Sequence, residues 1–304
     1  MNFEPFLHHF QTNRNCSPQT IQAYRSDLKM FEAFLQEQSI SSLSQVDHSI
    51  INGYIEHMHQ KANLRFGRTG LADSSIARRL AAISSYFEFE RATNELKLRN
   101  PLHDLSRKWK SNNEPKPVDE VTLDLLISRI TNIRDRTLMS LFLATGLRIS
   151  EMHQLDRDSI TIESVEDDAQ GQEHICGSGQ VVGKGNKRRA FFVDEKTCYL
   201  YDEYLVTRTD DNPALFLSER KQRISVRAIQ YTLAALCQRL GCPHINVHRL
   251  RHSFATKLAN RDISSIVLKD LLGHESFTTT QRYFKLTDTS LARGYFSAME
   301  YWNR

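Results

Sequence analysis

The stretch HRLRHSFAT, residues 248–256, places several basic side chains on one turn of an expected helix. His248, Arg251 and His252 have the spacing i, i+3 and i+4, which puts all three on the same helix face. Apolar residues such as Phe254 can face a core from another side. Arginine offers a planar cation that fits phosphate oxygens, and histidine can give or take a proton near neutral pH. A charged helix face is equally often plain solvated surface, so these residues need support from the rest of the chain.

Four more side chains that could take part in phosphate chemistry occur elsewhere in the chain. Each is weak evidence alone, because an arginine after a glycine, a basic turn or a helical tyrosine usually has no chemical role. They are Arg148 in LATGLRISEM, Lys184 in GKGNKRR, His274 directly after Gly273 in LLGHES, and Tyr283 in TTTQRYF. The ordered set of arginine, lysine, His-x-x-Arg, histidine and tyrosine is what carries information.

This set of residue types suits the attack of a tyrosine on a phosphodiester. Arginines beside the phosphate stabilise the negative charge that grows on its non-bridging oxygens in the transition state. A tyrosine with an ordinary pKa of about 10 needs a base or a cationic neighbour to attack at neutral pH, and the leaving sugar oxygen needs an acid. A covalent phosphotyrosine keeps the bond energy, so rejoining needs no ATP. Because the sequence has no Walker loop, GxGxxG or H-E-x-x-H motif, we expect no cofactor and no metal.

Composition is that of an ordinary soluble protein. The chain has 304 residues, with 40% hydrophobic and 25% charged residues, and two domains are expected. The net charge of +4 and a pI near 8.7 fit a polyanionic partner but are weak evidence alone. We find neither an apolar run long enough for a membrane helix nor a signal peptide at the start, and we expect a cytoplasmic protein.

The five scattered cysteines also indicate a reducing compartment, because an odd number does not suit a disulfide framework. Cys237, Cys242, His244 and His248 form the pattern C-x4-C-x-H-x3-H. This pattern is too compressed for a usual zinc site, in which a long loop separates two pairs of ligands. The sequence therefore favours inert thiols over zinc.

The chain is organised as a helical part, a linker and a mixed part. Residues 1–100 predict successive helices without a strand, and Ser17 with Pro18 marks the start of the first strong one. Residues 101–117 are polar and proline-containing, which is typical of a linker. The mixed domain is expected over 118–304.

Within this mixed domain, strands are expected between residues 155 and 194. SITIESV predicts one strand, EDDAQGQEHICGSG a polar loop, and GQVVGKGNKRRAFFV two strands joined by a glycine-rich turn. Helices are expected near 119–131, 134–145, 195–207, 225–240, 248–260, 264–272 and 279–301. Gly273 is expected to terminate the helix before it.

Taken together, the motifs resemble those of the tyrosine recombinase, or phage integrase, family in its Xer-like two-domain layout. ATGLRISE, GKGNK, HRLRHSFAT and LGH followed by Tyr283 occur in the family's order and at family-like spacing, over nearly the whole chain. The resemblance implies a mainly α fold with a small β-sheet. A helical, SAM-like core-binding domain would precede a mixed α+β catalytic domain of the tyrosine recombinase and type IB topoisomerase type.

The resemblance also implies roles for individual residues. Arg148 and Arg251 resemble the arginines that clamp the phosphate, and His274 resembles a further phosphate-binding position. Tyr283 resembles the nucleophile that becomes 3′-phosphotyrosyl, and His248 the residue that handles its proton. Lys184 resembles the general acid, with Lys187 as the competing assignment. Glu151 is expected to orient Arg148, and His252 to be a buried, hydrogen-bonded structural residue.

The implied activity is metal-independent, site-specific breakage and rejoining of DNA strands. The implied partners are double-stranded DNA with paired inverted-repeat core sites, and three further copies of the chain in a tetramer on two duplexes. A tail helix over about 286–304 would dock on a neighbouring protomer or pack on its own domain.

Two rival functions remain open at this point: a type IB topoisomerase-like strand transferase and a non-catalytic DNA-binding regulator. A lambda-type integrase with an added arm-site domain is disfavoured, because few residues precede the first strong helix. Resolution of cointegrates and integration of a mobile element would use the same active site.

Overall fold

A computed structural model describes residues 1–13, 16–60, 62–63, 68–93, 99–103, 116–166, 173–183, 186–261 and 263–284. The chain divides into two compact units, residues Met1–Asn113 and Glu114–Arg304. The division falls inside the segment 101–117 that is expected to be a linker. None of the helices in the described ranges combines the length and the apolarity that crossing a bilayer requires.

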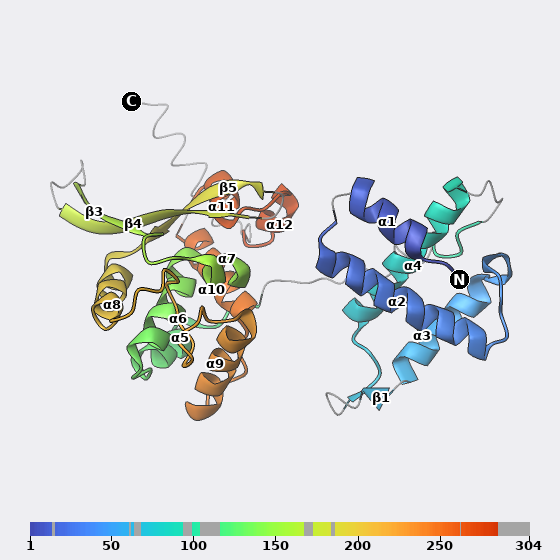
Figure 1. Cartoon of the computed structure of the whole chain (residues 1–304), viewed down its shortest axis with the longest axis horizontal. Coiled ribbons are helices and arrows are strands. Elements are labelled where there is room, and N and C mark those ends of the chain that lie inside the picture. Colours follow the sequence, from blue (N-terminus) through green and yellow to red (C-terminus); the bar gives the residue numbers. More distant parts are fainter. Residues whose placement is uncertain are drawn as a thin grey trace, which may run out of the picture. The chain divides into compact units, whose positions relative to one another are not determined.

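The first unit is a helical bundle, as the sequence predicts. Its helices are α1 (Glu4–Asn13), α2 (Pro18–Glu37), α3 (His48–Gln60) and α4 (Asp73–Thr93), with a 3-10 turn over Leu43–Gln45 (Figure 1). The Ser17 side chain accepts a hydrogen bond from the Thr20 amide, which confirms the predicted helix start. Every helix contributes apolar side chains to the core. Among those that are almost fully buried are Phe6, Leu28, Phe31, Ile51, Ile76 and Phe87.

Two sequence expectations for this part of the chain need correction. A short strand pair, β1 (Ala62–Asn63) with β2 (Arg68–Thr69), interrupts the helices. Leu102 lies in the expected linker but is 1% exposed and packs into the core of the first unit. Asn100 holds this segment in place, because its side-chain amide donates hydrogen bonds to Ser84 and Glu88. Packing by a single leucine thus extends the unit beyond the last helix.

The second unit combines helices with one antiparallel sheet in the order β3-β4-β5. The strands are β3 (Thr161–Glu166), β4 (Glu173–Val182) and β5 (Arg188–Val193), and α6 contacts β5 while α8 contacts β4 (Figure 1). The helices are α5 (Glu120–Ser128), α6 (Ile133–Thr145), α7 (Ile149–Gln154), α8 (Glu195–Val206), α9 (Val226–Arg239), α10 (Val247–Ala259), α11 (Ser265–Leu272) and α12 (Phe277–Gln281).

The predicted hairpin around residues 179–193 is confirmed, but β4 begins earlier than expected. Residues 173–178, which the sequence assigns to a polar loop, pair with β3, and Gly177 lies opposite both Ile162 and Val193. Glycine weakens a strand signal, which explains the error. Here it serves close packing, because a Cβ at Gly179 would overlap the Ser159 carbonyl oxygen and the Phe191 ring.

The prediction of a helix over 279–301 is also wrong for the residues of this range that the structure describes. Helix α12 begins at Phe277 and ends at Gln281, and Tyr283 lies in the turn after it. The β-branched run Thr278 to Thr280 is a poor helix former, which suits a short element. Residues 285–304, including the predicted tail helix, lie outside the described residues.

Gly146 ends α6 in the left-handed conformation, with φ 59°, and the Phe254 ring occupies the space where a Cβ would lie. Gly146→Ala is therefore expected to destabilise the second unit by about 3 kcal/mol, from backbone strain plus overpacking. Gly241 is the matched control, because its φ is 65° but no atom lies within 4 Å of its Cβ position. Gly241→Ala should cost only about 1 kcal/mol. If urea unfolding showed the same loss of stability for both variants, overpacking against Phe254 would be ruled out as a cause.

Candidate active site

Helix α10 carries His248, Arg251 and His252 of the HRLRH stretch. It begins after Asn246, whose side chain accepts a hydrogen bond from the Arg249 amide. His248 lies exposed on its first turn, while Arg251 and His252 are 3% and 9% exposed. The shared face predicted from the sequence therefore runs from solvent into the protein.

The turn between α6 and α7 positions Arg148. Gly146 reverses the chain, Leu147 is fully buried, and Arg148 is the N-cap residue of α7. Glu151 binds Arg148 twice: it accepts from the Arg148 amide at 2.6 Å and from its guanidinium Nη1 at 2.8 Å. Glu151 thus fixes both the start of the helix and the direction of the arginine, as expected.

Three arginines meet at the C-terminal end of α11. Arg189 donates to the carbonyl oxygen of Leu271, Arg251 to that of Leu272, and Arg148 to that of Gly273, the last at 2.8 Å. These carbonyls have no partner inside the helix, and the helix dipole makes this end negative, so cations are favoured there. Gly273 ends α11 in the left-handed conformation with φ 60°, as predicted. The arginines come from β5, α10 and the turn before α7, so this helix end joins three separate segments.

Arg189 is a residue of the site that the sequence analysis missed. On β5 it shares the inward face with Phe191 and Val193, so a charge stands where alternation places an apolar side chain. Its side chain is 8% exposed and donates to Glu151 at 2.6 Å. Its inward position follows from the strand register, which the sequence alone does not give.

Glu151 is the only carboxylate hydrogen-bonded to Arg148, Arg189 or Arg251 within the described residues. Burial raises its pKa, but the charge of Arg189 and the hydrogen bonds from Arg148 outweigh burial, so that the net pKa is lowered. Three guanidinium charges against one carboxylate leave two positive charges uncompensated. Burial, Arg148 and Arg189 together lower the pKa of Arg251 to about 9, which reflects the same excess of positive charge. An anion bound here would relieve it.

His274 follows the end of α11 and is held by Thr280. Its Nδ1 lies 2.8 Å from the Thr280 hydroxyl, which is fully buried. Burial, Arg251 and Arg148 lower the pKa of His274 to about 3, so the ring is neutral at pH 7. Thr280 is a second residue missed from the sequence, although its place three residues before Tyr283 puts it in the same motif.

Tyr283 contacts both His252 and His274 and is 5% exposed. Its ring is stacked on His274 with centroids 6.3 Å apart, and its hydroxyl oxygen lies 2.6 Å from Nδ1 of His252. Arg282 donates to the same hydroxyl at 3.5 Å. His252 is buried and hydrogen-bonded as expected, but its partner is the predicted nucleophile itself. His248 packs its ring edge against His252, with centroids 4.3 Å apart.

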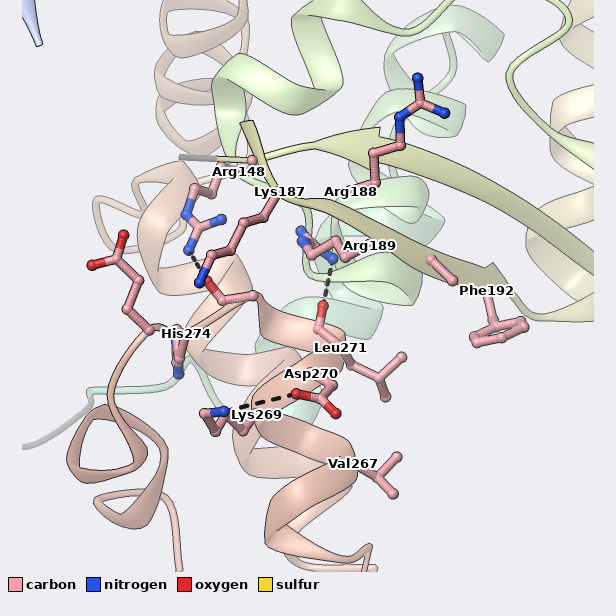
Figure 2. A pocket seen from close by; sticks show the side chains of 14 residues that line it. Arg148, Lys187, Arg188, Arg189, Phe192, Val267, Lys269, Asp270, Leu271 and His274 are labelled. Atoms are coloured by element: carbon pink, nitrogen blue, oxygen red, sulfur yellow. Dashed lines mark hydrogen bonds and ion pairs between the residues drawn. The ribbon is translucent and has the colours of Figure 1, made fainter. Parts of the chain in front are cut away.

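Two hollows open onto the site. The hairpin hollow, between β5 and α11, has a volume of about 480 Å³ and is lined by Arg148, Lys187 and His274 among others. Figure 2 shows the Lys187 side chain running beside Arg148 toward the segment that carries His274. The α9 hollow, of about 580 Å³, is lined by Arg148, His248 and Arg251 together with residues of α9. Arg148 therefore belongs to both hollows.

The structure thus brings together Arg148, His248, Arg251, His274 and Tyr283. Lys184 lies outside the described residues, and so does Gly185 beside it. No group of three metal-ligating side chains occurs among the residues that the structure describes.

The buried Glu151 carboxylate yields a test of the arginine cluster. Glu151→Gln leaves Arg189 without its counter-charge, and we expect a loss of about 3 kcal/mol of stability at pH 7. Because the pKa of Glu151 is lowered by folding, its contribution is present above the ordinary carboxyl pKa and is lost as pH falls through the folded pKa. The difference between wild type and variant should therefore shrink in acid.

Urea unfolding followed by hydrogen-exchange mass spectrometry measures this loss for each unit separately. The exposed Glu203 of α8 provides the control, since Glu203→Gln should leave stability unchanged. A pH-independent difference for Glu151→Gln would contradict the ionic role.

Comparisons with known proteins identify the family of the chain. Residues 3–94 match the phage integrase N-terminal SAM-like domain, and residues 118–290 match the phage integrase family. The chain is 32% identical over 298 residues to tyrosine recombinase XerC of Haemophilus influenzae, which covers 95% of this chain and 94% of that protein.

Solved structures show the same fold. XerH recombinase bound to palindromic difH substrate superposes with a TM-score of 0.71 at 22% identity, covering 96% of this chain and 82% of that one. The Tn1549 transposon integrase in complex with transposon right end DNA gives 0.72 at 18% identity, covering 99% and 100%. These matches confirm the fold class and the family that the motifs indicate. The chain belongs to the phage integrase family and is a tyrosine recombinase.

Proposed function

We propose that this protein cleaves and rejoins DNA at specific sites through a 3′-phosphotyrosyl intermediate formed on Tyr283. The observation that carries the proposal is the meeting of Arg148, Arg251 and Arg189 at the end of α11, with Tyr283 and His274 directly beside them. The site has excess positive charge and a hydroxyl nucleophile, which together suit a phosphodiester. The recombinase relatives favour this function over the topoisomerase alternative.

The arginines would hold the scissile phosphate while keeping their structural bonds. A guanidinium has five N–H donors. Arg148 uses two of them, toward Glu151 and the Gly273 carbonyl oxygen, and Arg251 uses two, toward the carbonyl oxygens of Gly146 and Leu272. The remaining donors can meet the non-bridging oxygens. His274 can add one more, because a Thr280 hydroxyl that donates to Nδ1 leaves the hydrogen of a neutral ring on Nε2.

In the reaction, a bond forms between the Tyr283 oxygen and phosphorus, and the bond from phosphorus to the 5′-oxygen breaks. We assign the proton for that leaving oxygen to Lys184, with Lys187 as the competitor. Lys187 is exposed and lines the hairpin hollow beside Arg148, so its position also suits the role of general acid. The family resemblance gives the proton of Tyr283 to His248, whose ring lines the α9 hollow with both phosphate-clamping arginines.

The substrate in this proposal is a pair of inverted-repeat core sites, one per duplex. We infer that residues 1–100 bind DNA beside the cleavage position, that 101–117 link the parts, and that 118–304 perform the chemistry. Solved relatives include a lambda integrase dimer bound to a COC′ core site, which supports DNA binding by more than one copy. We propose that four copies act on two duplexes, through tail helices over about 286–304, in the cytoplasm and without a cofactor.

The nucleophile is tested with a nicked suicide site that traps the covalent intermediate. Wild type should give an adduct that is stable in SDS, also in the presence of EDTA. Tyr283→Phe should bind the site normally but give no adduct, because it lacks only the attacking oxygen. Adduct formation by Tyr283→Phe would contradict the assignment, and a strict magnesium requirement for cleavage would contradict the mechanism.

The acid is tested with a 5′-bridging phosphorothiolate, whose sulfur leaves without protonation. Lys184→Ala should lose on the order of a hundredfold or more in cleavage of ordinary DNA and recover most of it on this substrate. Lys187→Ala is the matched comparison. Rescue of Lys187→Ala alone would move the role to that residue, and rescue of neither would remove it from the hairpin.

A further inference from the structure

Resting on the proposed function, we propose that His252 is a catalytic residue whose Nδ1 accepts the Tyr283 proton as the tyrosine attacks phosphorus. The sequence motifs predict a structural role for His252 and assign the proton of the tyrosine to His248. The geometry points to the buried histidine instead, because its Nδ1 lies 2.6 Å from the Tyr283 hydroxyl oxygen.

The hydrogen bonds around the hydroxyl favour this direction of proton transfer. Arg282 can only donate, so its 3.5 Å contact occupies a lone pair of the Tyr283 oxygen. The hydroxyl proton is then free to point at Nδ1 of His252. For Nδ1 to accept it, the ring must be neutral with its hydrogen on Nε2.

The surroundings of His252 keep it in that neutral state before DNA binds. Burial first, and then His248, Arg282 and Arg251, lower its pKa to about 4. A neutral imidazole is an available acceptor but a weak base. A bound phosphate brings negative charge next to Arg251 and offsets the cations that lower the pKa, so His252 becomes a stronger base when substrate is present. Substrate binding and proton acceptance are thereby linked.

The proton balance closes without another reactant. As the bond from the Tyr283 oxygen to phosphorus forms, the hydroxyl proton moves to Nδ1 of His252, and the general acid protonates the departing 5′-oxygen. In rejoining, the imidazolium returns its proton to the tyrosine as the bond to phosphorus breaks. His248 would then bind the phosphate and support His252 through the ring contact instead of touching the hydroxyl.

The test measures single-turnover adduct formation on a suicide site by wild type, His252→Asn and His248→Asn. The asparagine amide keeps a polar group near the Nδ1 position but cannot take a proton. We expect His252→Asn to bind half-sites like wild type and to form adduct on the order of a hundredfold or more slowly. Hydrogen exchange of α10 and α12 peptides reports whether the variant is folded.

Replacing Tyr283 with 2,3,5-trifluorotyrosine separates a base from a packing residue. A more acidic phenol needs less help from a base, so the deficit of His252→Asn should shrink on the order of tenfold or more, while wild type changes little. A residue that only packs against Tyr283 would leave the same deficit with either phenol. That result, or a wild-type rate in His252→Asn, overturns the proposal.

His248→Asn keeps the proposal testable if His252→Asn does not fold. Because His248 is exposed, its replacement should not disturb folding. It should retain the small response of wild type to fluorination. A strong response in His248→Asn would make that histidine the base and overturn the proposal. Absence of any Tyr283-dependent adduct in wild type would instead refute the proposed function.

Discussion

The end of helix α11 is the point on which the site depends. Its last carbonyls, at Leu271, Leu272 and Gly273, each accept a hydrogen bond from a different arginine. Those arginines come from β5, α10 and the turn before α7, so a single helix end fixes the relative position of all three. His274 follows Gly273 directly in the chain, so the same helix end also sets its position. The bonds that position the arginines of the proposed phosphate site therefore also join three segments of the second unit.

This arrangement concentrates positive charge, and much of the chemistry follows from that. Glu151 compensates only part of the charge of Arg148, Arg189 and Arg251, and its own pKa is lowered by them in spite of burial. The neighbouring histidines cannot add further charge, and their pKa values fall to about 4 for His252 and about 3 for His274. Neutral rings are the useful form here, because each can accept a hydrogen bond on one nitrogen and donate from the other. The site therefore has a net positive charge that a bound anion would neutralise.

The sequence predicted the parts of this site that have local signals. Gly273 marked a helix end because a left-handed residue is favoured there, and the spacing of His248, Arg251 and His252 placed them on one face. Most helices were found from apolar periodicity. Helix α1 was not, although Phe6, Leu7 and Phe10 form its buried stripe.

The parts that the sequence did not reveal are tertiary contacts. Nothing in the motif GKGNKRR distinguishes Arg188 on the exposed face of β5 from Arg189 on the inward face until the strand register is known. The pairing of His252 with Tyr283 joins residues far apart in the chain and depends on where α12 ends. The early start of β4 was hidden by Gly177 and Gly179, which serve packing and weaken the strand pattern.

The burial of Tyr283 connects the charge of the site to the order of events. A tyrosine that is 5% exposed and hydrogen-bonded to a neutral His252 has no reason to react before a phosphate arrives. In the proposed function, the phosphate binds where two positive charges are uncompensated, next to Arg251, and Arg251 lies on the same helix as His252. Binding of the anion therefore changes the electrostatic surroundings of the nucleophile at the moment when its target is in place. Water, being neutral, brings no comparable change to the surroundings of His252, so the proposed base is strengthened only when an anion such as a DNA phosphate is bound.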